Sequence, residues 1–144
     1  MSIARILTIL LIVGAGFLCA TAQPKTNSIT VAIPAMDKYS RKEMRVHRFL
    51  WDNWQRRRPA TAEVTFWGID SGDVYTVEMK PDSNGRFVVR EYMRHYQAPA
   101  RGPEPTTLVA EGRTLRRFRL RSGPFIVRLV TNDRKTVPLF EYLD

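Results

Sequence analysis

The chain contains few of the residues that most often carry out enzyme chemistry. It has one cysteine and two histidines among 144 residues. A metal site needs several His, Cys or carboxylate ligands at workable spacing, and neither His47 nor His95 has such neighbours in the sequence. The sequence also contains no glycine-rich phosphate loop and no serine, histidine and acid at a spacing that suggests nucleophilic catalysis. We therefore predict no metal, no cofactor and no catalytic residue.

Long hydrophobic runs are also missing, apart from one of moderate length near the start of the chain. Ile6–Leu18 is apolar, follows a basic residue and precedes the small-x-small sequence Ala20–Ala22. A helix that spans a bilayer needs about 20 apolar residues, whereas this combination of features is typical of a secretory signal peptide. We predict that residues 1–22 are removed by cleavage between Ala22 and Gln23. The alternative is that they are retained and tether the protein to a membrane.

The predicted signal peptide determines the expected compartment and the expected extent of the folded part. It implies export to the periplasm or the exterior of a bacterial cell. Cys19 lies within the signal peptide, so the processed chain forms no disulfide and depends on its own core for stability. Residues 23–37 are expected to be a leader in which Ser28–Ala35 forms an edge strand, because Pro34 cannot donate a ladder hydrogen bond. Residues 38–144 are expected to be a single α+β domain.

Acidic residues are the minority among the charged residues. The chain has 14 Asp and Glu against 23 Lys and Arg, which gives a formal net charge of +9. A basic domain attracts anionic partners, such as an envelope polymer, lipid head groups or an acidic protein. The predicted export argues against nucleic acid as the usual partner. The alternative is that the arginines only keep the protein soluble.

One amphipathic helix is predicted after the leader. Ser40 and Glu43 fit a capping box, in which each side chain accepts a hydrogen bond from the other residue's backbone amide at the helix start. Pro59 ends the helix, because the residue before a proline avoids the helical conformation. The helix is predicted over Arg41–Arg57. Its apolar stripe at three- and four-residue spacing comprises Met44, His47, Leu50, Trp51 and Trp54.

After Pro59 the hydrophobic period changes to two, which predicts strands. They are expected over Ala62–Ile69, Val74–Lys80, Arg86–Tyr96, Leu108–Ala110, Thr114–Arg121, Phe125–Thr131 and Val137–Tyr142. Turns are expected at Asp70–Asp73, Asp82–Gly85, Glu111–Gly112 and Asn132–Lys135. A three-residue loop that pairs Asp82 with Arg86 places Glu78 opposite Arg90, and opposite charges across a strand pair favour this register.

These elements predict the α+β class. We expect one N-terminal amphipathic helix packed on a curved, mostly antiparallel sheet of five to seven strands, because each element must bury its apolar face. The element order resembles that of cystatin-like and nuclear-transport-factor-like rolls. This resemblance is limited to the order of the elements and implies no function.

Two groups of residues are candidates for a binding site. In the first group, arginines alternate with aromatic or apolar residues along two strands, a pattern that binds anionic and ring-shaped ligands through charge and stacking. This group comprises Arg90, Tyr92, Arg94, Arg117, Arg119 and Arg121. The second group, Trp51, Trp54 and Glu91, would line a cavity between helix and sheet. The first group predicts a non-enzymatic binding domain for an anionic envelope partner, and the second predicts a small-ligand carrier or an enzyme.

Overall fold

The computed structural model describes residues 27–34, 37, 40–69, 71–97, 104–121 and 123–140. The predicted signal peptide, with its cleavage site and Cys19, lies outside these residues. The described part contains one helix and seven strands, which are β1 (Asn27–Pro34), α2 (Arg41–Gln55), β2 (Ala60–Trp67), β3 (Ser71–Pro81), β4 (Phe87–Gln97), β5 (Thr107–Arg119), β6 (Phe125–Thr131) and β7 (Thr136–Pro138).

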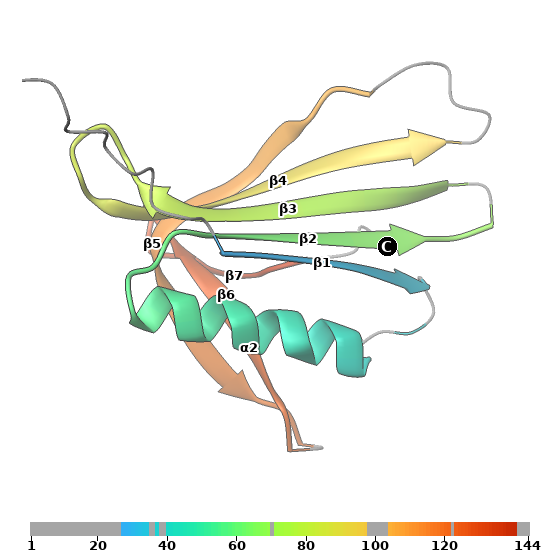
Figure 1. Ribbon diagram of the computed structural model, residues 1–144, viewed down its shortest axis with the longest axis horizontal. Coiled ribbons are helices and arrows are strands. Elements are labelled where there is room, and N and C mark those ends of the chain that lie inside the picture. Colours follow the sequence, from blue (N-terminus) through green and yellow to red (C-terminus); the bar gives the residue numbers. More distant parts are fainter. Residues whose placement is uncertain are drawn as a thin grey trace, which may run out of the picture.

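All seven strands form one curved sheet in the order of the sequence (Figure 1). β1 pairs with β2 in parallel, and every other neighbouring pair is antiparallel. The helix packs against β1 and β2 on one side and against β6 on the other. β5 and β6 cross the helix, and the end of this hairpin extends beyond it (Figure 1). The prediction of an α+β protein with a curved, mostly antiparallel sheet is confirmed.

The helix is the second element rather than the first. β1 occupies the region where an edge strand was expected, and it lies at one end of the strand order. Because β1 and β2 are parallel, the chain needs a long crossover between them, and α2 provides it. The helix therefore follows the edge strand expected in the leader, and its placement as the N-terminal element is not confirmed.

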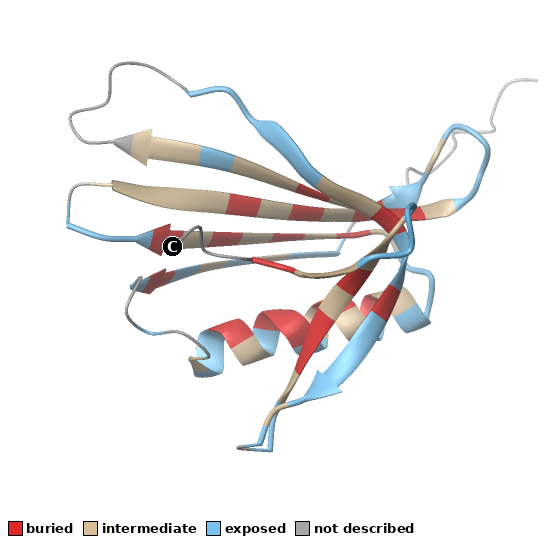
Figure 2. Cartoon of the chain, turned by 180° about the vertical axis from the view of Figure 1, so that it is seen from behind, coloured by how far each residue is buried: buried red, intermediate tan, exposed pale blue. Residues whose placement is uncertain are grey.

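The core lies between the helix and the inner face of the sheet, which is the face turned toward the helix. Figure 2 shows buried residues alternating along the strands, as expected for strands with one covered face. Val46 and Leu50 of the helix are 0 % exposed. The sheet contributes most of the remaining buried apolar residues, which include Ile33, Val64, Phe66, Tyr75, Val77, Met79, Val89, Leu115, Val127 and Leu129.

Only half of the predicted capping box is present at the helix start. The Ser40 hydroxyl accepts a hydrogen bond from the Glu43 backbone N–H at 3.2 Å. The Ser40 N–H instead donates to the carbonyl of Asp37, and the Glu43 side chain is buried. The buried face of the helix also differs from the predicted stripe. It comprises Glu43, Val46, His47, Leu50 and Asn53, whereas Met44, Trp51 and Trp54 are half-buried at its margin.

The helix ends at Gln55, two residues before the predicted end. Arg57 adopts a left-handed conformation with φ 51°. The Arg57 N–H donates to the carbonyl of Trp54, and the Arg58 N–H donates to that of Asn53. This pair of bonds is a Schellman motif, which satisfies carbonyls that the helix end would otherwise leave without donors.

The predicted hairpin between β3 and β4 is confirmed in its register. The Asp82 N–H donates to the Arg86 carbonyl, and Glu78 lies opposite Arg90. Gly85 has φ 71°, the conformation that the three-residue loop requires. Local turn chemistry was therefore sufficient to predict this pairing.

The structure corrects three of the predicted turns and strands. Glu111–Gly112 is not a turn, because β5 continues through it and passes there from its pairing with β4 to its pairing with β6. The turn after β2 comes earlier than predicted, since β3 already begins at Ser71 and Gly72 pairs with Trp67. β7 covers only the first part of the strand predicted over Val137–Tyr142, and residues 141–144 lie outside the described part.

Candidate functional site

The hairpin of β5 and β6 has a one-sided charge. We call residues 112–131 the arginine hairpin, because this segment contains no Asp, Glu or Lys. Its arginines are Arg113, Arg116, Arg117, Arg119, Arg121 and Arg128. Antiparallel pairing brings these residues together on two neighbouring strands and the turn that joins them. A large part of the net positive charge of the chain is therefore gathered on one element.

Arg117 and Arg119 lie on the inner face of the hairpin. The register pairs Arg117 with Val127 and Arg119 with Phe125, and paired residues project from the same face of a sheet. Because Val127 is 0 % exposed and belongs to the core, this face is turned toward the helix. The Arg117 guanidinium carbon lies 5.4 Å from the ring centroid of Trp51 and 5.1 Å from that of Phe125, within the range of cation–π attraction.

Two hollows adjoin on this side of the molecule. One, of about 460 Å³, is lined by Arg117, Arg119, Gly123 and Phe125. The other, of about 350 Å³, is lined by Arg41, Met44, Arg45, Arg48 and Pro124. Phe125 of the first hollow and Pro124 of the second are consecutive in the chain, so the two hollows lie next to each other there. Together they place five guanidinium groups beside apolar side chains.

These five arginines have no ion-pair partner among the residues that the structure describes. The ion pairs in the described part involve other basic residues. Arg117 and Arg119 are exposed, as are the three arginines of the helix. The hollows therefore have the charge and the accessibility that an anionic ligand requires.

The outer face and the end of the hairpin carry further arginines. Arg128 lies over the ring of Phe118 at 4.7 Å, and Phe118 remains 37 % exposed. Arg116 pairs with Arg128 across the strands. At the end of the hairpin the Leu120 N–H donates to the Pro124 carbonyl and the Gly123 N–H donates to the Leu120 carbonyl, and Arg121 is exposed there. Arginines thus occupy both faces of the hairpin and its turn.

The predicted residues on β4 lie elsewhere. Arg90, Tyr92 and Arg94 project from the outer face of β4, opposite to the buried Glu91. The structure therefore does not join them to Arg117 and Arg119, which lie on the inner face. The alternation along the strands showed which residues share a face, but it could not show which face the helix covers.

The arginines of β4 also have a different electrostatic environment. The Glu111 carboxylate accepts a hydrogen bond from Arg90 Nε, which raises the pKa of Arg90 and lowers the pKa of Glu111. Glu63 and Glu78 project from the same outer face. The outer face of β2–β4 therefore carries balanced charge, unlike the arginine hairpin.

Trp51 and Trp54 contact the arginine hairpin, whereas Glu91 lies buried beside the segment that follows β7. The two tryptophan rings contact each other with centroids 5.2 Å apart. The indole N–H of Trp54 donates to the carbonyl of Arg113 at 3.2 Å. Glu91 is 1 % exposed, and its carboxylate accepts a hydrogen bond from the Phe140 N–H at 2.6 Å. The tryptophans support the arginine hairpin, whereas Glu91 holds the segment after β7.

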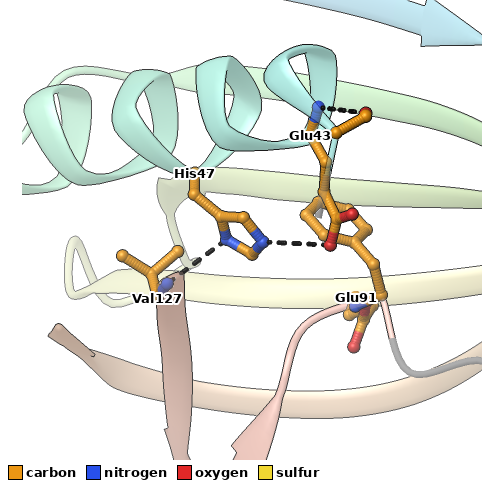
Figure 3. A network of polar contacts seen from close by, with 6 residues as sticks. Glu43, His47, Glu91 and Val127 are labelled. Carbon is orange, nitrogen blue, oxygen red and sulfur yellow. Dashed lines mark hydrogen bonds and ion pairs between the residues drawn. The ribbon is translucent and has the colours of Figure 1, made fainter. Parts of the chain in front are cut away.

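A buried polar network joins the helix to the hairpin (Figure 3). His47 Nδ1 accepts a hydrogen bond from the Val127 N–H at 3.2 Å. Its Nε2 lies 3.6 Å from the Glu43 carboxylate, and the Phe140 ring packs against the imidazole edge-on. Because Nδ1 is an acceptor, the proton of the neutral ring lies on Nε2 and faces Glu43. Sequence reasoning placed Glu43 in a capping box and missed its pairing with His47, although the two residues are four apart on one helix face.

The other histidine lies at the far end of β4. His95 Nδ1 is 2.7 Å from the carboxylate of Asp73, and this hydrogen bond raises the pKa of His95. No group of three or more His, Cys, Asp or Glu residues that could hold a metal occurs among the described residues. Within the same described part, no helix is long and apolar enough to cross a membrane.

Comparison with protein-family models, with curated proteins and with solved structures gave no match to this chain. The function must therefore be argued from the site itself.

Proposed function

We propose that the protein is a non-enzymatic binding module for an anionic partner, and that the arginine hairpin together with the first half of α2 forms its binding surface. The observation that carries the proposal is the pair of adjoining hollows with five arginines and no ion-pairing carboxylate among the described residues. The predicted signal peptide supports an anionic partner in the cell envelope.

The chemistry of the hollows favours binding to phosphate, sulfate or carboxylate groups. A guanidinium group presents its donors in a planar fork that matches such anions. The rings of Trp51 and Phe125 both contact the Arg117 guanidinium. This contact limits the rotamers of Arg117, so less side-chain entropy is lost when a ligand binds.

The charge comparison between the two candidate surfaces decides which one we favour. On the outer face of β2–β4, Arg90 is paired with Glu111, and Glu63 and Glu78 lie nearby in the register. An anion that approached this face would meet carboxylates as well as arginines. We therefore assign the binding surface to the arginine hairpin rather than to Arg90, Tyr92 and Arg94.

Retention on a heparin resin tests the proposal. Replacing Arg117 and Arg119 together by Gln removes two charges from one hollow. A control variant with Gln at Arg58 and Arg94 removes two exposed charges from other surfaces. We expect the hairpin variant to elute at clearly lower salt than the control variant, because direct contacts at the binding surface contribute more to heparin retention than the overall net charge does. Equal elution of the two variants would contradict a localised site.

A further inference from the structure

We infer that the anionic partner is a phospholipid membrane surface, and that the end of the arginine hairpin inserts into the head-group layer. This inference rests on the proposed function and names its partner. It depends on the placement of the arginines, on the apolar residues among them and on the shape of the hairpin.

The arginines surround the end of the hairpin instead of lining one side of it. Arg117 and Arg119 project from the inner face, Arg116 projects from the outer face, and Arg121 lies in the turn. A rigid polymer or a folded acidic protein would contact one face and leave the other arginines in water. Head groups around an inserted element can approach it from every side, so they can contact arginines on both faces and in the turn.

Apolar side chains alternate with these arginines. Phe118 is 37 % exposed although it is a large hydrophobic residue, and Pro124 at the end of the hairpin is also exposed. An aromatic ring beside basic residues is the combination that interfacial membrane-binding segments use. A soluble polyanion offers no apolar environment for Phe118.

The hairpin also has the shape that insertion requires. β5 and β6 extend beyond the helix, and no other described element covers their end (Figures 1 and 2). The Leu120 N–H donates to the Pro124 carbonyl, so the turn at this end is short. The hollow that contains Arg41, Arg45 and Arg48 lies beside this end at Pro124, where the helix arginines would reach the same head groups.

The test compares sedimentation of the full chain with vesicles of phosphatidylcholine alone and with vesicles that also contain phosphatidylglycerol. We expect binding that depends on the anionic lipid and weakens with added salt. Binding through a retained apolar N-terminal segment would instead occur on both kinds of vesicle. For the variant R117Q/R119Q we expect a partition coefficient about thirty-fold lower than that of the unsubstituted chain, since each basic residue near an anionic surface contributes about five-fold. The R58Q/R94Q variant is the matched control.

Phe118→Ser separates a membrane from a soluble polyanion. We expect it to lower the partition onto anionic vesicles by about five-fold, because part of the ring leaves water on insertion, and to lower heparin retention far less, because a soluble polyanion offers the ring no apolar environment. Urea unfolding of this variant checks that the fold is intact. Equal vesicle partition of the variant and the unsubstituted chain would overturn the insertion. If the unsubstituted chain is retained on heparin but does not bind anionic vesicles, the membrane partner is refuted and the proposed function stands. If the unsubstituted chain binds neither heparin nor anionic vesicles, the proposed function is refuted as well.

Discussion

Substitution of Gly112 by alanine is the sharpest test of how the hairpin is built. Gly112 is buried at the point where β5 passes from β4 to β6. A Cβ atom added there would lie 2.1 Å from the carbonyl oxygen of Val130 and 2.9 Å from its carbonyl carbon. Both atoms belong to the backbone of β6, so the clash cannot be relieved by a rotamer change.

The expected cost follows from this geometry. Overpacking of a core costs about 1–3 kcal/mol, and a clash with backbone places Gly112→Ala near the upper end, at about 3 kcal/mol. For a domain of this size that corresponds to a fall in Tm of about 10 °C. Urea unfolding followed by tryptophan fluorescence measures the change in the free energy of unfolding.

Gly85 provides the control for this substitution. It has no atom within 4 Å of an added Cβ, but its φ is 71°. Gly85→Ala should therefore cost only the strain of a left-handed residue, about 1 kcal/mol. A turn at Gly112, as the sequence had suggested, would leave room for a methyl group. If Gly112→Ala unfolds with the same free energy as the unsubstituted protein, the close approach of β5 to the Val130 carbonyl of β6 is refuted.

Two further predictions concern the histidines. His47→Leu leaves the Val127 N–H without its acceptor inside the protein, and we expect the free energy of unfolding to fall by about 2 kcal/mol; a change below about 0.5 kcal/mol in urea unfolding would contradict the buried hydrogen bond. NMR titration should show a pKa of His95 above its ordinary value of about 6.5, and Asp73→Asn should lower it. Because the folded-state pKa is raised, the stability that this pair contributes is fully present below the ordinary pKa and is lost as the pH rises through the folded-state pKa. The two proteins should therefore differ most in urea stability at acidic pH, and an unchanged pKa of His95 in the variant would count against the ion pair.

Features that depend on neighbouring residues were predictable from the sequence. The register of the β3–β4 hairpin followed from the turn residues Asp82–Gly85 and from the charges of Glu78 and Arg90. The helix start followed from Ser40. In each case the deciding hydrogen bond or charge pair lies within a few residues, or across one short loop.

Features that depend on distant pairing were not predictable. Glu111–Gly112 has the composition of a turn, but pairing with β4 before it and β6 after it keeps β5 extended. The burial of Glu43 could not be predicted from the helix sequence alone. Glu43 pairs with His47, and His47 accepts a hydrogen bond from Val127 of the distant strand β6.

The candidate site was predicted in part. Arg117 and Arg119 were singled out correctly as sharing a face, but Arg41, Arg45 and Arg48 were assigned no role, because they meet the hairpin only after the sheet curves around the helix. The balanced charge on the outer face of β2–β4 could also not be predicted from the sequence, because Glu111 contacts Arg90 only through the pairing of β4 with β5.

NMR mapping of the backbone amides during titration with a soluble polyanion such as dextran sulfate tests the central claim most directly. The account predicts that chemical shifts change along residues 116–128 and along Arg41–Arg48, and that added salt reverses the changes. The amides of Arg90–Arg94 should move little. Shift changes concentrated on β4 instead, with the hairpin unaffected, would contradict the assignment of the binding surface to the arginine hairpin.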